Sequence, residues 1–158
     1  MGAPSQRFNH VALSVSPDLL DEAGRGDLLR FYGDVFGWTE MPTLTVPRER
    51  LVLRAHSNEQ FVFLVAGEPA LRSGAGDHFG LSVATPAEFD DLYARAREES
   101  KRDDRVELDE KQVEDHHGVL SLHNFYVRFL LPLRVEVQCY EWAAGLGPDS
   151  TAEDAPER

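Results

Sequence analysis

Two histidines of this sequence open copies of one short pattern. The chain reads HVALSV from His10 and HFGLSV from His78, and four of the six positions are identical. Each histidine alternates with apolar residues at a period of two, which is typical of a strand with one buried face. An imidazole can ligate a metal ion, while a lone buried histidine more often bonds a backbone carbonyl. The repetition favours a shared role for the two histidines over coincidence.

The elements around the first histidine are predicted in the order strand, helix, strand, strand, strand. Asp27 can cap a helix that Gly37 ends, and the acidic, glycine-containing stretch at 18–26 is predicted to be a loop or a frayed first turn. Alternating apolar residues predict the strands at 8–15, 38–46, 51–56 and 61–66.

The same order follows the second histidine. Thr85, Pro86 and Glu88 form a complete helix-start signature, and the helix should run to about Ser100. Strands are predicted at 78–84, 105–113, 119–131 and 133–142. The sequence therefore predicts an α+β protein made of two βαβββ modules, at about 8–67 and 77–142, in a single domain at 8–142. The acidic tail at 143–158 has little to bury and is predicted to be disordered.

Composition limits the partners and the compartment. Sixteen basic and 28 acidic residues give a net charge of −12, which disfavours nucleic acid and anionic membrane surfaces as partners. No apolar run is long enough to span a membrane or to act as a signal peptide, so we expect a cytoplasmic protein. The single cysteine, Cys139, excludes an intrachain disulfide and is expected to be a buried, inert thiol.

Five segments resemble the vicinal oxygen chelate superfamily, which includes glyoxalase I, extradiol dioxygenases, methylmalonyl-CoA epimerase, and fosfomycin- and bleomycin-resistance proteins. They read FNHVAL at 8–13, LRFYGDVFGW at 29–38, DHFGLSV at 77–83, FYVR at 125–128 and RVEV at 134–137. The resemblance implies a cupped mixed β-sheet with flanking helices, a small-molecule ligand and a homodimer.

The resemblance also implies a metal site. By position it assigns His10 and His78, which open the modules, and Glu136 on the closing strand of the second, as ligands of a divalent metal. Such a 2-His-1-carboxylate set suits Fe(II) first and Mn(II) next, with Zn(II) or Ni(II) as further candidates. Phe63 stands where glyoxalase I and the epimerase carry a carboxylate, so three-ligand relatives fit better.

A second match points to the extradiol dioxygenases. Their spacing of histidine, tyrosine and ligand glutamate is similar to that of His117, Tyr126 and Glu136, which implies that His117 and Tyr126 are catalytic. The Asp-Pro-x-Gly turn of those enzymes is replaced here by the apolar residues 129–132.

Two functions follow as expectations. The first is a metal-dependent enzyme, a dioxygenase or a transferase, acting on a small substrate with vicinal oxygens. The second is a metal-free protein of the bleomycin-resistance type that sequesters a small molecule. Each proposed site residue also has a plainer interpretation: Glu136 could face solvent beside Arg134 and Gln138, and His117 could belong to a solvated turn.

Overall fold

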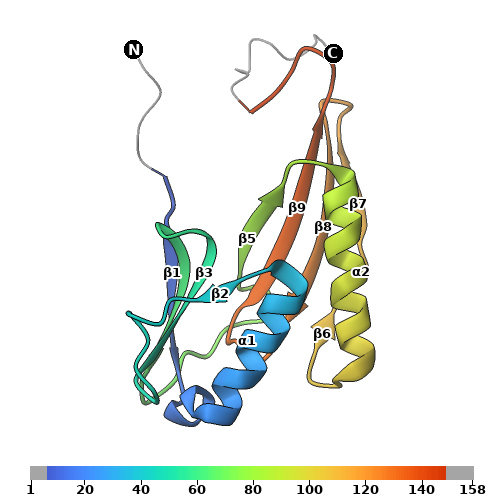
Figure 1. Ribbon diagram of the computed structural model, residues 1–158. Coiled ribbons are helices and arrows are strands. Elements are labelled where there is room, and N and C mark those ends of the chain that lie inside the picture. Colours follow the sequence, from blue (N-terminus) through green and yellow to red (C-terminus); the bar gives the residue numbers. More distant parts are fainter. Residues whose placement is uncertain (1–6, 149–158) are drawn as a thin grey trace, which may run out of the picture. The chain divides into compact units, whose positions relative to one another are not determined.

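Each half of the chain forms one sheet and one long helix, as Figure 1 shows for the computed structural model, which describes residues 7–148. The first unit comprises the residues up to 77 together with 129–132, and the second comprises 78–128 and the residues from 133 onward. The first unit follows the βαβββ order, and the second follows it with one further short strand after its helix, so the α+β prediction is confirmed.

The first unit contains a four-stranded sheet in the order β1-β4-β3-β2. Its elements are β1 (His10–Val15), the 3-10 helix η1 (Pro17–Leu20), α1 (Glu22–Phe36), β2 (Thr39–Glu40), β3 (Arg50–Ser57) and β4 (Gln60–Ala66). Strands β1 and β4 are parallel, and His10 lies opposite Phe61.

The second unit contains a sheet in the order β5-β9-β8-β6, with β7 also paired to β8. Its elements are β5 (His78–Val83), α2 (Pro86–Arg102), β6 (Glu107–Leu108), β7 (Gln112–His116), β8 (Leu120–Arg128) and β9 (Arg134–Trp142). Strands β5 and β9 are parallel, and His78 lies opposite Arg134. The sequence repeat therefore corresponds to two strands with the same place in their sheets.

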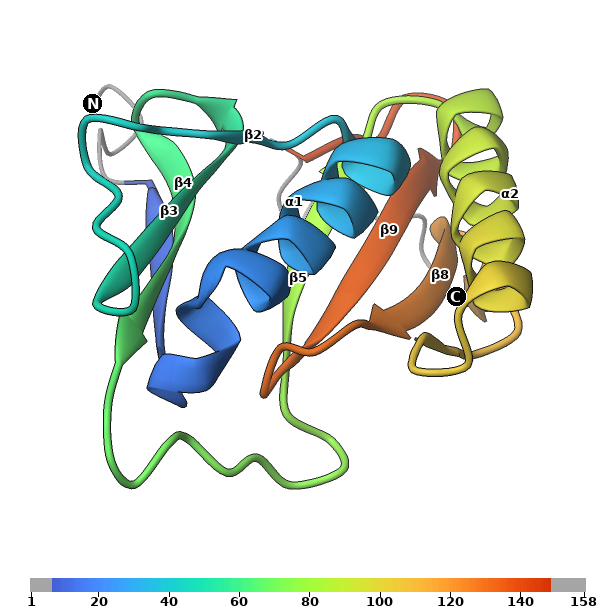
Figure 2. The same cartoon turned by 60° about the horizontal axis from the view of Figure 1, so that its bottom comes forward.

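Helix α1 begins earlier than predicted. Asp21 caps it, because the Asp21 side chain accepts a hydrogen bond of 2.9 Å from the backbone nitrogen of Gly24. A Cβ atom at Gly24 would lie 2.4 Å from the carbonyl oxygen of Leu19, so glycine is required by packing and does not mark a loop. Gly37 ends the helix with a φ of 71°, as predicted, and the chain then enters β2 (Figure 2).

Three predicted strands are wrong in extent, and one of them, predicted at 119–131, ends at Arg128 as β8. Pairing after α1 is limited to Thr39–Glu40, because Pro42 favours a turn in which the backbone nitrogen of Leu44 bonds the carbonyl of Met41. The predicted strand at 105–113 is split into β6 and β7. The residues between them bond elsewhere: the Asp109 backbone nitrogen reaches the Tyr126 carbonyl, and the Glu110 carboxylate accepts from Tyr93.

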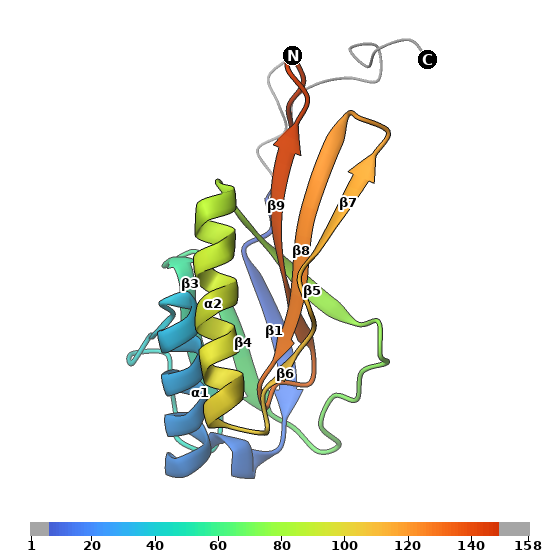
Figure 3. The ribbon, with the colours of Figure 1, turned by 90° about the vertical axis from the view of Figure 1, so that its right-hand side faces the viewer.

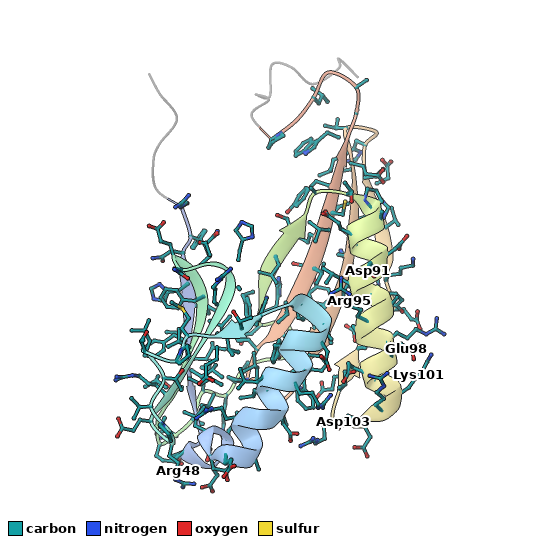
Figure 4. All side chains as sticks on the ribbon, in the orientation of Figure 1. Arg48, Asp91, Arg95, Glu98, Lys101 and Asp103 are labelled. Atoms are coloured by element: carbon teal, nitrogen blue, oxygen red, sulfur yellow. The ribbon has the colours of Figure 1, made fainter. Side chains whose placement is uncertain are left out.

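Helix α2 covers one face of the second sheet (Figure 3). Thr85 and Glu88 form the predicted capping box. Phe89 and Tyr93 pack edge-on against Phe125 of β8. The outer side of α2 carries the ion pairs Asp91–Arg95 and Glu98–Lys101 (Figure 4), so this surface is a solvated one.

The residues between β8 and β9 belong to the first unit. Phe129 and Leu131 are buried, and the Phe129 ring stacks on Phe31 of α1 with 4.6 Å between ring centroids. The Tyr32 hydroxyl donates a hydrogen bond of 3.1 Å to the Phe129 carbonyl. The apolar character of residues 129–132 fits this place in the core of the first unit.

The predicted tail lies mostly outside the described residues. Within the described part, Ala143 donates a backbone hydrogen bond to Val119, and Leu146 donates one to Ala143. Among residues 7–148, no helix is long and apolar enough to cross a membrane.

Candidate functional site

Glu136 is the buried carboxylate at the centre of the candidate site. It lies on β9 and is 6% exposed. The Tyr126 hydroxyl donates a hydrogen bond of 2.7 Å to its Oε1 atom. The Nε2 atom of His78 lies 3.2 Å from its Oε2 atom. Glu136 therefore does not face open solvent, and the structure brings three of the five predicted site residues together.

Strand register explains this meeting. In neighbouring strands, Tyr126 of β8 and Gly80 of β5 both lie opposite Glu136, so their side-chain positions share one face of the sheet. This face is the one opposite α2, because the alternate residue Phe125 contacts Phe89. A Cβ atom at Gly80 would lie 3.8 Å from Glu136 Oε2 and 3.9 Å from Gln138 Oε1, so the glycine adds no side chain of its own beside the carboxylate. His78 precedes Gly80 by two residues and therefore points to the same face.

Arg134 supplies positive charge beside Tyr126. Its guanidinium carbon lies 4.4 Å from the centroid of the Tyr126 ring, and its Nη1 atom lies 2.7 Å from Asp109 Oδ2. The Nε atom of Arg134 is buried and has no hydrogen-bond partner among the described residues. Stacking on Tyr126 and the ion pair with Asp109 hold the guanidinium in place at the first residue of β9.

The Tyr126 hydroxyl keeps its proton at neutral pH. Burial raises the pKa of Tyr126 to about 12, and the hydrogen bond to the Glu136 carboxylate adds to the shift. A phenol with such a pKa remains protonated, so it donates to Glu136 and does not serve as a base. By the same physics, burial raises the pKa of Cys139, which fits the prediction of an inert thiol.

His10 belongs to the first unit. Its ring stacks on Phe61, with 5.0 Å between centroids, and its Nδ1 atom lies 2.9 Å from Asn9 Oδ1. The register also bears out the predicted alignment of the closing strands. His10 pairs with Phe61 and His78 with Arg134, so Phe63 and Glu136 hold equivalent positions in the two sheets.

His117 lies in the turn between β7 and β8, with a φ of 58°, and is exposed. The neighbouring strands place Leu120 opposite Trp142, and Tyr126 opposite Glu136. Six residues of strand separate Leu120 from Tyr126, or about 20 Å. The structure therefore does not bring His117 to Tyr126, despite the sequence spacing, because a continuous stretch of β8 lies between them.

The donor set fits a divalent cation in part. Two ligands at right angles on a transition metal, each about 2.1 Å from it, lie about 3 Å apart. The distance of 3.2 Å between His78 Nε2 and Glu136 Oε2 matches that spacing. Within residues 7–148, no three His, Cys, Asp or Glu side chains are grouped so that they could hold a metal ion. His78 and Glu136 could thus supply two ligands, and a third would come from elsewhere.

Sequence reasoning missed Gly80 and Asp109. The signal for Gly80 was available, since it replaces Ala12 in the repeated strand pattern, and a glycine within a strand often marks a close approach to another group. Asp109 gave no such signal, because its role depends on Arg134, which is far from it in sequence.

No protein-family model and no curated protein sequence matches the chain. Several solved structures are similar to it. A glyoxalase/bleomycin resistance protein/dioxygenase from Alicyclobacillus acidocaldarius has a TM-score of 0.61 and 17% identity, over 89% of this chain and 95% of that one. A lactoylglutathione lyase from Agrobacterium tumefaciens has a TM-score of 0.59 and 18% identity, over 86% and 95%.

The fosfomycin resistance protein FosX from Listeria monocytogenes has a TM-score of 0.56 and 14% identity, over 94% of this chain and 97% of that one. Similarity at these identities is similarity of fold, and an activity does not follow from it. The repeated βαβββ unit, its paired opening and closing strands and these likenesses together show that the chain has the fold of the vicinal oxygen chelate superfamily.

Proposed function

We propose that the protein is a metal-dependent enzyme that acts on a small substrate with vicinal oxygens. His78 and Glu136 supply two ligands of a divalent metal, Fe(II) or Mn(II) in the first place, and His10 of the first unit supplies the third. The observation that carries the proposal is the buried Glu136 carboxylate, with an imidazole nitrogen 3.2 Å from one of its oxygens. When bound, the metal supplies Lewis-acid chemistry to the substrate oxygens.

The surrounding residues have distinct tasks in this proposal. Tyr126 donates to Oε1 of Glu136, which leaves Oε2 as the oxygen that faces His78. A hydrogen bond of this kind orients a ligating carboxylate. Gly80 places no side chain of its own beside Oε2, and the Arg134 guanidinium lies against the Tyr126 ring, 4.4 Å from its centroid.

A metal-free binding protein is the second candidate. It is favoured by a specific observation, namely that Tyr126 and His78 already provide the Glu136 carboxylate with two polar neighbours. Such a carboxylate can be buried without a cation. In both functions we expect a homodimer and a small-molecule ligand.

Metal titration of the purified protein separates the two candidates. We expect Mn(II) or Fe(II), added under anaerobic conditions after removal of metals with a chelator, to raise the melting temperature and to bind at one ion per chain. Glu136→Gln, His78→Ala and His10→Ala should each weaken binding at least tenfold.

The matched control is His116→Ala. His116 is exposed and lies 3.7 Å from Glu114, so it forms a second histidine–glutamate pair in the same unit. This variant should bind metal as the wild type does. Equal metal affinity in the wild type and Glu136→Gln would overturn the enzyme proposal and leave the binding protein as the interpretation.

A further inference from the structure

An exposed pair of aromatic rings lies on the face of the second sheet that carries Glu136. Glu136, Gln138, Tyr140 and Trp142 alternate along β9, and side chains at a period of two share one face of a strand. Tyr140 is 40% exposed and Trp142 is 37% exposed. Large apolar groups that remain in contact with water at one place mark a binding surface more often than scattered ones do.

The neighbouring strand extends this surface. Leu122 of β8 lies opposite Tyr140, and Leu120 lies opposite Trp142. The two rings are nearly parallel, with an interplanar angle of 11° and 6.2 Å between centroids. Flat, parallel rings beside two leucines form a surface suited to a planar, apolar group.

The polar groups next to the rings are ordered. The Tyr140 hydroxyl donates a hydrogen bond of 2.6 Å to Gln138 Oε1, which directs the Gln138 amide nitrogen away from that contact. The side-chain nitrogen of Asn124 donates a hydrogen bond of 2.9 Å to Glu114. Gln138 and Asn124 lie opposite each other, between Glu136 and the rings. Along β9, this face therefore carries first a charged side chain, then amide side chains and then aromatic rings.

The charge near the rings selects against anions. Glu114 of β7 lies opposite Leu122, so it shares the face that carries the rings, and its side chain is 51% exposed. The whole chain carries a net charge of −12. Aromatic faces also attract cations through the ring quadrupole. A ligand group here would be neutral or positively charged.

We propose that Tyr140 and Trp142 bind a planar aromatic part of the ligand that is neutral or cationic, while the Glu136 end of the same face binds its oxygen-bearing part. The second half of this statement rests on the function proposed above. Four residues of strand separate Glu136 from Tyr140, or about 13 Å. The ligand is therefore longer than a single ring, and short hydroxy or keto acids are not the natural substrates.

The two tryptophans of the chain make a direct test possible. Trp38 is buried, at 4% exposure, so its indole N–H signal in a ¹⁵N-correlated NMR spectrum serves as an internal reference for that of Trp142. Trp142→Phe assigns the two signals. The probe is N-methylquinolinium, a planar cation without vicinal oxygens, titrated in the presence of a chelator. 2-Naphthalenesulfonate, a planar anion of similar size, is the comparison.

We expect N-methylquinolinium to shift the Trp142 signal and leave the Trp38 signal in place. Tyr140→Ala should weaken its binding roughly 3- to 10-fold, the value of one aromatic contact. The matched control is Val113→Ala, because Val113 is an exposed apolar residue, 62% exposed, that pairs with His123 on the opposite face of the same sheet. This control should bind the probe as the wild type does.

Three outcomes would overturn the proposal: an unmoved Trp142 signal, equal binding of the anion, or a dimer that Trp142→Ala converts into a monomer, since a second copy would then cover the rings. Glu136→Gln separates this proposal from the preceding one. The probe should bind this variant normally even where metal binding is lost, so the aromatic surface and the metal site can fail independently.

Discussion

The candidate site depends on Glu136, whose carboxylate is buried. A buried carboxylate is stable only with polar partners, and here they come from two different neighbouring strands. The repeated strand pattern drew attention to His78, and the resemblance to the vicinal oxygen chelate superfamily assigned Glu136 by position. It could not assign Tyr126 its contact with Glu136, because that contact depends on the register of β8 against β9.

The raised pKa of Tyr126 predicts a loss of stability at high pH. In the folded protein this pKa is about 12, compared with an ordinary value of 10.0. Between these values the unfolded chain releases the phenol proton and the folded chain keeps it, so the free energy of unfolding falls as the pH rises from about 10 to about 12. Denaturant unfolding of the wild type and Tyr126→Phe across this window should show a smaller decline in the variant.

Tyr140→Phe is the control for this measurement, since Tyr140 is exposed and bonds Gln138 instead of a carboxylate. It should decline with pH as the wild type does. Parallel curves for the wild type and Tyr126→Phe would contradict the assigned contact between Tyr126 and Glu136.

Helix boundaries show what local patterns can and cannot predict at the scale of elements. The end of α1 at Gly37 and the start of α2 at Thr85 follow from backbone preferences, which are local. The start of α1 was predicted too late because the stretch containing Gly24 was assigned to a loop or a frayed first turn, while this glycine allows a close approach to Leu19 that only the fold creates.

Two glycines of this helix should respond in opposite directions to the same substitution. A Cβ atom would meet nothing within 4 Å at either Gly26 or Gly37, so only the backbone conformation differs. Gly37→Ala places alanine at a φ of 71° and should destabilise the protein by about 1 kcal/mol. Gly26→Ala, inside α1, should stabilise it by about 0.5–1 kcal/mol. Urea unfolding measures both, and changes of the same sign would contradict the assigned helix end.

The segment between β8 and β9 should behave as core. Phe129 is fully buried and stacks on Phe31, so Phe129→Ala should lower the free energy of unfolding by about 3–5 kcal/mol. Leu130→Ala is the control, because this neighbouring side chain is only partly buried and should cost much less. Chemical denaturation followed by circular dichroism compares them, and similar losses would count against a core role for Phe129.

At the scale of the whole molecule, the duplication made the fold predictable. Two copies of one strand pattern, each followed by a helix and further strands, were enough to derive the order of helices and strands. Site residues were predictable only where the two modules match or where they differ at equivalent positions, as at Phe63 and Glu136. His117 shows the opposite case, because the strand from Leu120 to Tyr126 lies between them and keeps them apart.

The placement of residues 129–132 predicts how the chain responds to a cut. Arg72 lies in the exposed connection between β4 and β5, and a protease site engineered there divides the chain into two fragments. We expect the fragments to elute together in native size-exclusion chromatography, because Phe129 and Leu131, on the later fragment, remain in the core beside α1. Leu131→Ala combined with Phe129→Ala should release them, whereas separation of the unmutated fragments would contradict this assignment.

The position of residues 129–132 also affects which parts of the chain can be exchanged by recombination. The chain contains two copies of one module, but neither half of the sequence forms a complete unit. Four residues of the first unit, 129–132, lie within the sequence of the second. A recombination event that transferred the second half alone would carry an unmatched apolar segment with it and leave Phe31 without its stacking partner. The two halves are therefore expected to have been inherited and exchanged as a pair.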